Sequence, residues 1–268
     1  MAKLTPGLVS VTLDALAPSR VIHLAVEAGL EAIEWSARRH VPHGDTAEAA
    51  RVGERTRHAG LSLGNYGSYL RLGEPDADAA AIRQVIETAH QLGAPGVRVW
   101  AGARPSAHAS PAYRSGVTDG LDACTERAAE RGLDVVIEYH ADTLTDDPAS
   151  ALELVQASRA SNVRLGWQPP NADAFAGRLA SLDAVAAVSA DVHVFHWSLD
   201  GRGEVVRHAL SQGTEDWVRY FARIRSLPAD RRVLLEFVPG DDPALLQREA
   251  HVLRDLLAGS DAPLKEAP

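Results

Sequence analysis

The stretch LDVVIEYHAD, residues 133–142, ends an apolar run with a carboxylate and, two residues later, an imidazole. Leu133 and the Val-Val-Ile run of residues 135–137 are typical of a parallel strand that is buried on both faces. A carboxylate at the end of such a strand, here Glu138, is costly to bury unless a cation or hydrogen-bond donors meet it. We therefore expect a positively charged partner or a metal ion beside Glu138.

Similar β-rich runs recur along the whole chain and alternate with Ala-rich amphipathic stretches. Strands are expected at 8–13, 30–35, 61–66, 96–100, 133–139, 162–168, 191–197 and 232–238. Glycines follow the intervening helices in EAGL, HAGL, QLGA and ERGL, and Pro18, Pro148 and Pro243 stand where first-turn prolines belong. This alternation predicts a single α/β domain over residues 1–258, a (β/α)₈ TIM barrel with eight parallel strands, and a solvated tail at 259–268. A doubly wound sheet is the alternative, but no Gly-rich phosphate loop follows the first strand.

Composition narrows the classes of partner. The chain of 268 residues has a formal net charge of −9, with no clustering of Lys and Arg, which argues against a nucleic-acid or anionic-membrane partner. Its single cysteine, Cys124, cannot form an internal disulfide, and no stretch reads as a leader or a membrane span. We expect a cytoplasmic protein, either a monomer or a homo-oligomer.

In a barrel of this kind, chemistry gathers where the strands end. Reading off the expected strand ends gives Glu34, Trp35, Tyr66, Arg98, Trp100, Glu138, His140, Trp167, Gln168, His196, Trp197 and Glu236. Two carboxylates and an imidazole, Glu138, Glu236 and His196, form a mixed oxygen and nitrogen set that suits a divalent metal. His193 is the rival histidine, because odd spacing puts it on the opposite face of the strand from His196. The plainer alternative pairs the carboxylates with arginine or lysine.

The remaining strand-end residues are candidates for substrate contact. The indole rings of the strand-end tryptophans could pack against the C–H face of a sugar, or they could simply cover the end of the hydrophobic core. Arg98 could bind a substrate oxyanion or form a structural ion pair with a glutamate. His140 could contact substrate or orient Glu138. The expected substrate-binding set is His140, Trp100, Arg98, Trp167, Trp197, Glu34, His40 and Tyr66.

The chain resembles the xylose isomerase-like TIM-barrel superfamily of sugar phosphate isomerases and epimerases over nearly its full length. The resemblance rests on GLEAIEW, YGSYLRLG (66–73), RVWAG (98–102), VIEYHADTLTD (136–146), WQPPN (167–171), FHWS (195–198), SQGTEDW (211–217) and LLEF (234–237). It implies a divalent metal (Mn, Co, Zn or Mg) held by Glu, Asp, His and Glu from strands five to eight. Glu138, His196 and Glu236 match the first, third and fourth ligands.

The second ligand position departs from that pattern. Where the family has Asp and, three residues later, His, this chain has Gln168 and Asn171. A glutamine carbonyl can bind a metal but carries no charge, so we expect weaker metal binding. Water, substrate or Asp173 could fill the position instead.

The resemblance implies isomerase or epimerase chemistry on a carbohydrate, with Glu138 and Glu236 exchanging the proton next to a carbonyl that the metal polarises. A lyase or dehydratase acting on a sugar or an inosose, including C-glycoside cleavage, would use the same metal and base. Hydrolysis of abasic DNA on a related barrel is disfavoured by the acidic charge. A non-catalytic carbohydrate-binding barrel remains open, since the Asp-to-Gln change weakens the metal site.

Overall fold

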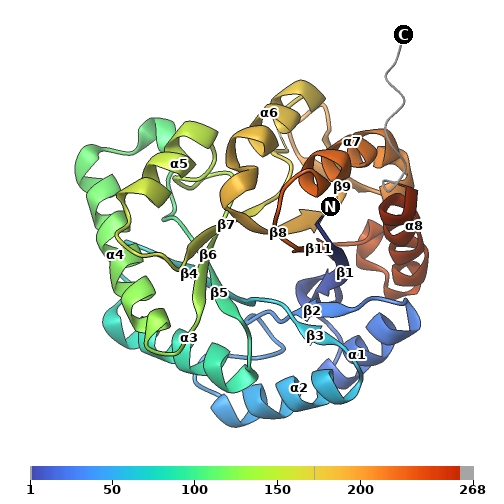
Figure 1. Cartoon of the computed structure of the whole chain (residues 1–268), viewed down its shortest axis with the longest axis horizontal. Helices are drawn as coiled ribbons and strands as arrows, with labels where there is room; N and C mark the ends of the chain where they lie inside the picture. The colour runs from blue at the N-terminus through green and yellow to red at the C-terminus, as the bar shows by residue number, and fades with distance from the viewer. Residues whose placement is uncertain (1, 172, 260–268) are drawn as a thin grey trace.

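The computed structural model describes residues 2–171 and 173–259, and its main feature is a curled sheet of parallel strands surrounded by helices (Figure 1). The strands follow the spatial order β3-β2-β1-β11-β8-β7-β6-β5-β4. Their bounds are β1 Leu4–Val9, β2 Ala32–Glu34, β3 Ser62–Leu63, β4 Tyr66–Arg71, β5 Gly96–Trp100, β6 Asp134–Glu138, β7 Val163–Trp167, β8 Ser189–Val194 and β11 Arg231–Leu235. This arrangement is a TIM-barrel-like α/β fold.

The number of strands differs from the prediction. The sheet has nine strands because the expected strand 61–66 ends at Leu63, and the chain resumes as β4 at Tyr66. Gly64 passes close to the backbone of Glu34, and the Asn65 side chain donates a hydrogen bond to Asp191 of β8. β3 and β4 are the two ends of the strand order, so a complete eight-stranded barrel is not confirmed and stays a prediction.

The helix boundaries that Pro18, Pro148 and the four glycines indicate are confirmed, whereas Pro243 begins a short 3₁₀ helix, Pro243–Leu245, and α8 starts only at Leu246. Their bounds are α1 Pro18–Glu27, α2 Thr46–His58, α3 Ala79–Leu92, α4 Pro111–Ala129, α5 Pro148–Ala157, α6 Phe175–Val185, α7 Thr214–Arg225 and α8 Leu246–Gly259. Asp45, Asp78 and Asp147 accept hydrogen bonds from the first turns of α2, α3 and α5. The predicted glycine stops all have a positive φ, between 65° at Gly29 and 82° at Gly60.

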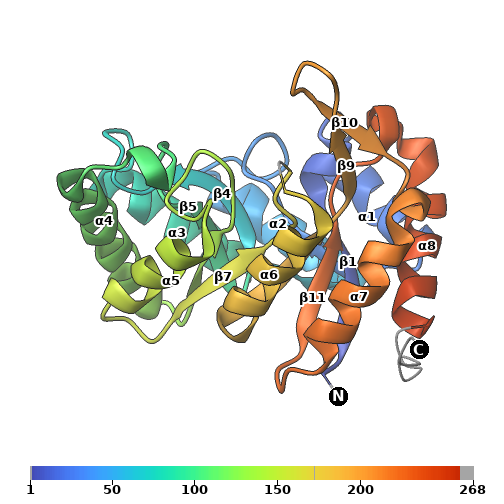
Figure 2. The ribbon, with the colours of Figure 1, turned by 90° about the horizontal axis from the view of Figure 1, so that it is seen from above.

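Several strand boundaries are shifted, and the largest shifts are in the first strand and at the end of β8. The first strand is Leu4–Val9 rather than 8–13, and Ser10–Leu13 forms a short 3₁₀ helix at its end. β8 ends at Val194 rather than continuing to residue 197. After it, the chain forms an antiparallel hairpin of β9 (His196–Leu199) and β10 (Val205–His208), which rises above the end of the sheet in Figure 2.

One main sheet with its helices organises the described residues, while the domain limits at 1 and 258 stay a prediction. α8 extends to Gly259, and the rest of the predicted tail, 260–268, lies outside the described residues. None of the described helices combines the length and the apolar character that crossing a membrane requires.

Candidate metal centre and active site

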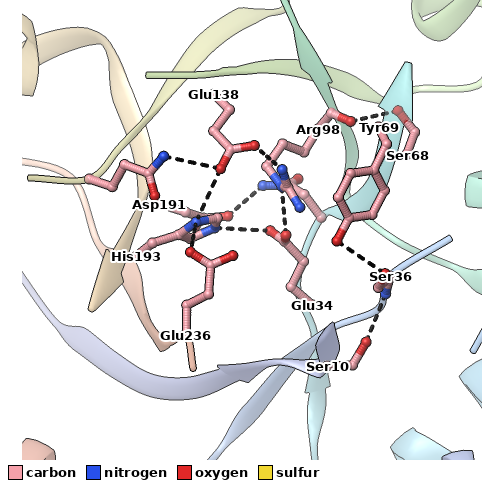
Figure 3. Close-up of polar contacts among 12 residues, drawn as sticks. Ser10, Glu34, Ser36, Ser68, Tyr69, Arg98, Glu138, Asp191, His193 and Glu236 are labelled. Atoms are coloured by element: carbon pink, nitrogen blue, oxygen red, sulfur yellow. Dashed lines mark hydrogen bonds and ion pairs between the residues drawn. The ribbon is translucent and has the colours of Figure 1, made fainter. Parts of the chain in front are cut away.

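Three acidic and basic side chains from neighbouring strands meet inside the curled sheet. Glu138 is the last residue of β6, Glu236 directly follows β11, and His193 lies on β8 between them in the strand order. Their ligand atoms all lie within 4.8 Å of one another. His193 Nδ1 is 3.2 Å from Glu236 Oε2 and 3.7 Å from Glu138 Oε1, as Figure 3 shows. All three side chains are buried.

The histidine in this cluster is His193, not the predicted His196. The prediction treated residues 191–197 as one strand, but β8 ends at Val194 and the chain turns into the hairpin. His196 therefore points elsewhere: its ring lies 5.6 Å from the ring of His208 and packs against Gly213. The structure thus brings His193, and not the predicted His196, beside the two carboxylates, and the choice of metal ligand stays a prediction.

Glu138 presents its two oxygens to different partners. Oε2 accepts hydrogen bonds from Arg98 Nη1 and Trp100 Nε1, while Oε1 accepts one, at 3.3 Å, from the side-chain amide of Gln168. Arg98 also donates from Nε to Glu34 Oε1 at 2.7 Å. Oε1 of Glu138 thus stays turned towards His193, while Oε2 belongs to an ion pair with arginine.

A glycine makes room for this arginine. At Gly67 a Cβ atom would come within 2.8 Å of Arg98 Nη2 and 3.2 Å of Glu34 Oε1. Any larger residue at position 67 would displace the guanidinium or the carboxylate. Gly67, in the YGSYLR stretch of β4, is therefore part of the site's construction.

The charges in the cluster shift one another strongly. Burial alone would raise the pKa of Glu34, but Arg98 and His193 outweigh it and lower that pKa to about 2. Burial likewise opposes the lowering of the Glu138 pKa, and Arg98 and His193 again prevail. Burial would lower the pKa of His193, yet Glu236 and Glu34 raise it well above its usual value. These carboxylates therefore favour the protonated, cationic imidazole when no metal ion is bound.

The donor set fits a divalent cation. Ligands 2.0–2.2 Å from one ion are up to about 4.4 Å apart, so the spacing found here needs only a small adjustment. Glu34, Glu138 and Glu236 carry three buried negative charges against one on Arg98, so with His193 neutral two negative charges are unmatched. Rotation of the Gln168 amide would add its carbonyl oxygen as a neutral ligand. Glu138, His193, Glu236 and Gln168 are the residues that could hold the ion.

Several predicted substrate residues do lie beside this cluster. Trp100 is partly exposed, donates to Glu138 and stacks on His140 with ring centroids 4.6 Å apart. Trp197 stacks on Phe195 at 4.2 Å and lies 5.4 Å from the ring of Phe237, the residue after Glu236. Trp100 and His140 thus present aromatic surface beside Glu138, while Trp197 packs on Phe237, the neighbour of Glu236 in the chain.

The side chains of other predicted substrate residues make contacts away from the cluster, and their predicted role in substrate binding stays untested. Trp167 is fully buried behind β7, donates to Ser181 and packs on Trp217 and Tyr220. Tyr66 is also fully buried, and its hydroxyl donates to the Val41 carbonyl at 2.6 Å.

His40 is buried and makes hydrogen bonds with Ser10 Oγ at 3.0 Å and the Leu16 carbonyl at 3.1 Å. Glu34 and Arg98 lie in the cluster, but each is buried and paired with the other. Arg98, paired with Glu34, therefore holds the Glu138 carboxylate in place, and neither buried side chain offers a free polar group to a substrate.

The sequence interpretation missed Tyr69 and passed over His193. Tyr69 has a φ of 57°, unusual for a bulky residue, at a register shift between Gly67 and Arg71 of β4. Its ring lies 5.4 Å from the Arg98 guanidinium, and its hydroxyl is 3.3 Å from Ser36 Oγ. For His193 a signal existed, since Asp191 and His193 are polar residues on one face of a strand whose valines occupy the other.

Comparison with known proteins agrees with this architecture. The sequence pattern of the family described as "Xylose isomerase-like TIM barrel" matches residues 22–256. The chain belongs to this family. No curated protein matches the sequence.

Solved structures share the fold at low identity. A probable 3-DHS dehydratase, AsbF, from Bacillus anthracis is 18% identical with a TM-score of 0.76, over 95% of this chain and 99% of that one. An L-ribulose 3-epimerase is 16% identical with a TM-score of 0.72, over 100% of both chains. A xylose isomerase-like protein from Mycobacterium smegmatis, in complex with magnesium, is 16% identical with a TM-score of 0.67, over 91% and 89%. At this identity the likeness shows the fold alone.

Proposed function

We propose that the chain is a divalent-metal-dependent isomerase or epimerase of a sugar or sugar derivative. The observation that carries the proposal is the buried group of Glu138, His193 and Glu236, within 4.8 Å, at the carboxyl ends of parallel strands in a member of this family. The likeness to an L-ribulose 3-epimerase and to a magnesium complex supports both the chemistry and the cation.

A bound divalent cation would draw electron density from a substrate carbonyl and acidify the adjacent C–H group. Glu236 would remove that proton. Among the described side chains only His193 pairs with its carboxylate, so one oxygen stays available for the proton. Glu138 is held by Arg98 and Trp100, and its lowered pKa makes it a poor proton acceptor. Its role would be to fix the cation, while Glu236 would deliver the proton that it took to the adjacent carbon in an isomerisation. An epimerisation needs a proton from the opposite face, which Glu138 could supply only after taking one up from solvent.

The aromatic side chains at the mouth bind and orient the carbohydrate. The stacked pair of Trp100 and His140 presents one apolar face, and Trp197 with Phe237 presents another. Apolar faces of this kind pack against the C–H groups of a sugar ring or an open ketose chain, while hydroxyl groups face the polar cluster. They also exclude water from the proton that is transferred.

Dehydration is a second candidate, favoured by the likeness to a probable 3-DHS dehydratase. It begins with the same abstraction of a proton next to a carbonyl, and Glu236 would again be the base. The two reactions part afterwards, since the dehydratase expels a β-hydroxyl group while the epimerase returns a proton. Detection of an unsaturated product separates them.

The test combines metal analysis with an exchange assay. Protein purified without chelator is expected to contain close to one equivalent of Mn, Co, Zn or Mg. Incubated with ketoses in deuterated water, the metal-loaded protein should exchange a C–H proton for deuterium, and treatment with a chelator should abolish the exchange. Full activity in the chelated protein, or absence of a bound divalent metal after loading, would contradict the proposal.

A further inference from the structure

A cavity with mixed polar and apolar walls lies at the same end of the molecule as the candidate metal centre. Its volume is about 320 Å³, and it is bounded by the loops after β1, β2 and β11 and by β10 of the hairpin. Phe237, which lines it, directly follows Glu236 in the chain. The Phe237 amide donates to Thr12 Oγ1 at 2.8 Å, which fixes this wall to the loop after β1. The cavity and the reacting cluster therefore share the loop after β11.

Three arginines line this cavity: Arg38 and Arg39 from the loop after β2, and Arg207 from β10. Arg38 and Arg39 both direct Nε towards one oxygen of Asp14, at 3.3 Å and 3.5 Å. One carboxylate cannot occupy the donors of two guanidinium groups, each of which has five N–H groups. The Nη groups of Arg38 and Arg39 therefore remain available as donors.

The third arginine is held in place by aromatic rings. The guanidinium of Arg207 lies 3.9 Å from the ring centroid of Phe237 and 5.7 Å from that of Trp197, and it pairs with Asp241. Stacking of this kind orients the planar N–H groups without occupying them. Asp241 is largely exposed, so an incoming anion can compete with it for Arg207.

The wall behind Arg207 has an unfavourable backbone. Phe237 and Asp241 both have left-handed conformations, with φ of 62° and 53°. Such conformations in non-glycine residues are strained and gather at ligand-binding sites. In this conformation the Phe237 ring lies under the Arg207 guanidinium, on the wall of the cavity.

We propose that this cavity binds an anionic group of the substrate, a carboxylate or a phosphate, through Arg38, Arg39 and Arg207. The substrate would then be an acidic sugar derivative whose carbon chain extends from the arginines to Glu236. The inference that the bound anion belongs to a substrate rests on the proposed function. Anion binding by the cavity does not, since it is independent of the metal.

Binding is best measured by titration calorimetry on the whole protein, with and without chelator. The probes are D-ribulose 5-phosphate, D-gluconate and uncharged D-ribulose. At least one anionic probe should bind at least about tenfold more tightly than D-ribulose, and Arg207→Gln should remove that advantage. The double variant Arg38→Gln/Arg39→Gln should weaken binding similarly. Arg202→Gln, in the hairpin turn and outside the cavity, should leave binding unchanged.

The outcomes separate this inference from the proposed function. Loss of binding for only the phosphate probe or only the carboxylate probe identifies the group that the cavity takes, and either supports the inference. Tight anion binding without any metal-dependent turnover supports the cavity and contradicts the enzyme. Equal affinity for charged and uncharged probes, or an unchanged affinity in Arg207→Gln, overturns the inference whatever the catalytic result.

Discussion

Glu138 and Glu236 stand at equivalent places, each at the carboxyl end of a buried strand, yet their surroundings differ. Glu138 accepts hydrogen bonds from Arg98, Trp100 and Gln168, whereas Glu236 contacts only His193 among the side chains of residues 2–171 and 173–259. The first carboxylate is fixed by three donors and held ionised, whereas the second has one partner, His193. Position along a strand therefore brings a carboxylate to the site, and its neighbours decide what it can do.

Removing the arginine should break the fixed half of this pair. Arg98→Leu leaves Glu34 and Glu138 buried without their shared cation, and we expect a loss of about 3–5 kcal/mol in the free energy of unfolding. Urea denaturation followed by circular dichroism measures it. Arg98→Lys should lose less, because it keeps the charge, and the exposed Arg127→Leu should change stability by under about 1 kcal/mol. A near-neutral Arg98→Leu would show that the ion pair does not hold the site together.

Neutralising the free carboxylate should affect catalysis instead. Glu236→Gln is expected to reduce kcat by about 10²–10⁴-fold, since general base catalysis contributes that much, and to abolish deuterium exchange. Glu138→Gln should chiefly weaken metal binding, because its role is to hold the cation. Kinetics at saturating metal distinguish the two, with the exposed Glu153→Gln as the matched control. If both variants lose kcat alike at saturating metal, the division of roles is wrong.

The histidine between the carboxylates gives a third test. His193→Asn should weaken divalent-metal affinity by about 10–100-fold, because it removes an imidazole from the cluster. His196→Asn should change that affinity by less than about threefold, since its ring packs against His208 and Gly213. Equilibrium dialysis with Mn²⁺ measures both. The reverse order of effects would restore the assignment read from the sequence.

The sequence predicted those features of the fold that depend on local patterns. The strand at 96–100 was predicted to the residue, and β6 and β7 within one residue at each end, since apolar runs and glycine stops are properties of neighbouring residues. The break between β3 and β4 was missed, because Gly64 and Asn65 leave the strand through contacts with Glu34 and Asp191. No local pattern encodes those contacts.

The same distinction applies to the site. Glu138 and Glu236 were predicted because a carboxylate after an apolar run is visible in one segment. His193 and His196 could not be ranked, since the choice depended on where β8 ends and the hairpin begins. The partners of Arg98 belong to β2 and β6, and Tyr69 enters the site through a bulge, so both roles emerge only from the tertiary arrangement.

The fixed half of the cluster also has a pH signature. The pKa of Glu34 falls from 4.5 to about 2 in the folded protein, so the unfolded chain binds the proton more readily. The stability from this group is therefore fully present above pH 4.5 and is lost as the pH falls towards 2, at about 1.4 kcal/mol per pH unit. Urea unfolding at pH 4.5 and pH 3.5 measures the start of this loss, which should be about 1 kcal/mol over that interval. Glu34→Gln should be less stable at pH 4.5 and show a correspondingly shallower loss, because its amide cannot titrate. Parallel slopes in the two proteins would mean that Arg98 does not hold Glu34 ionised, and the contrast with Glu236 would lose its electrostatic basis.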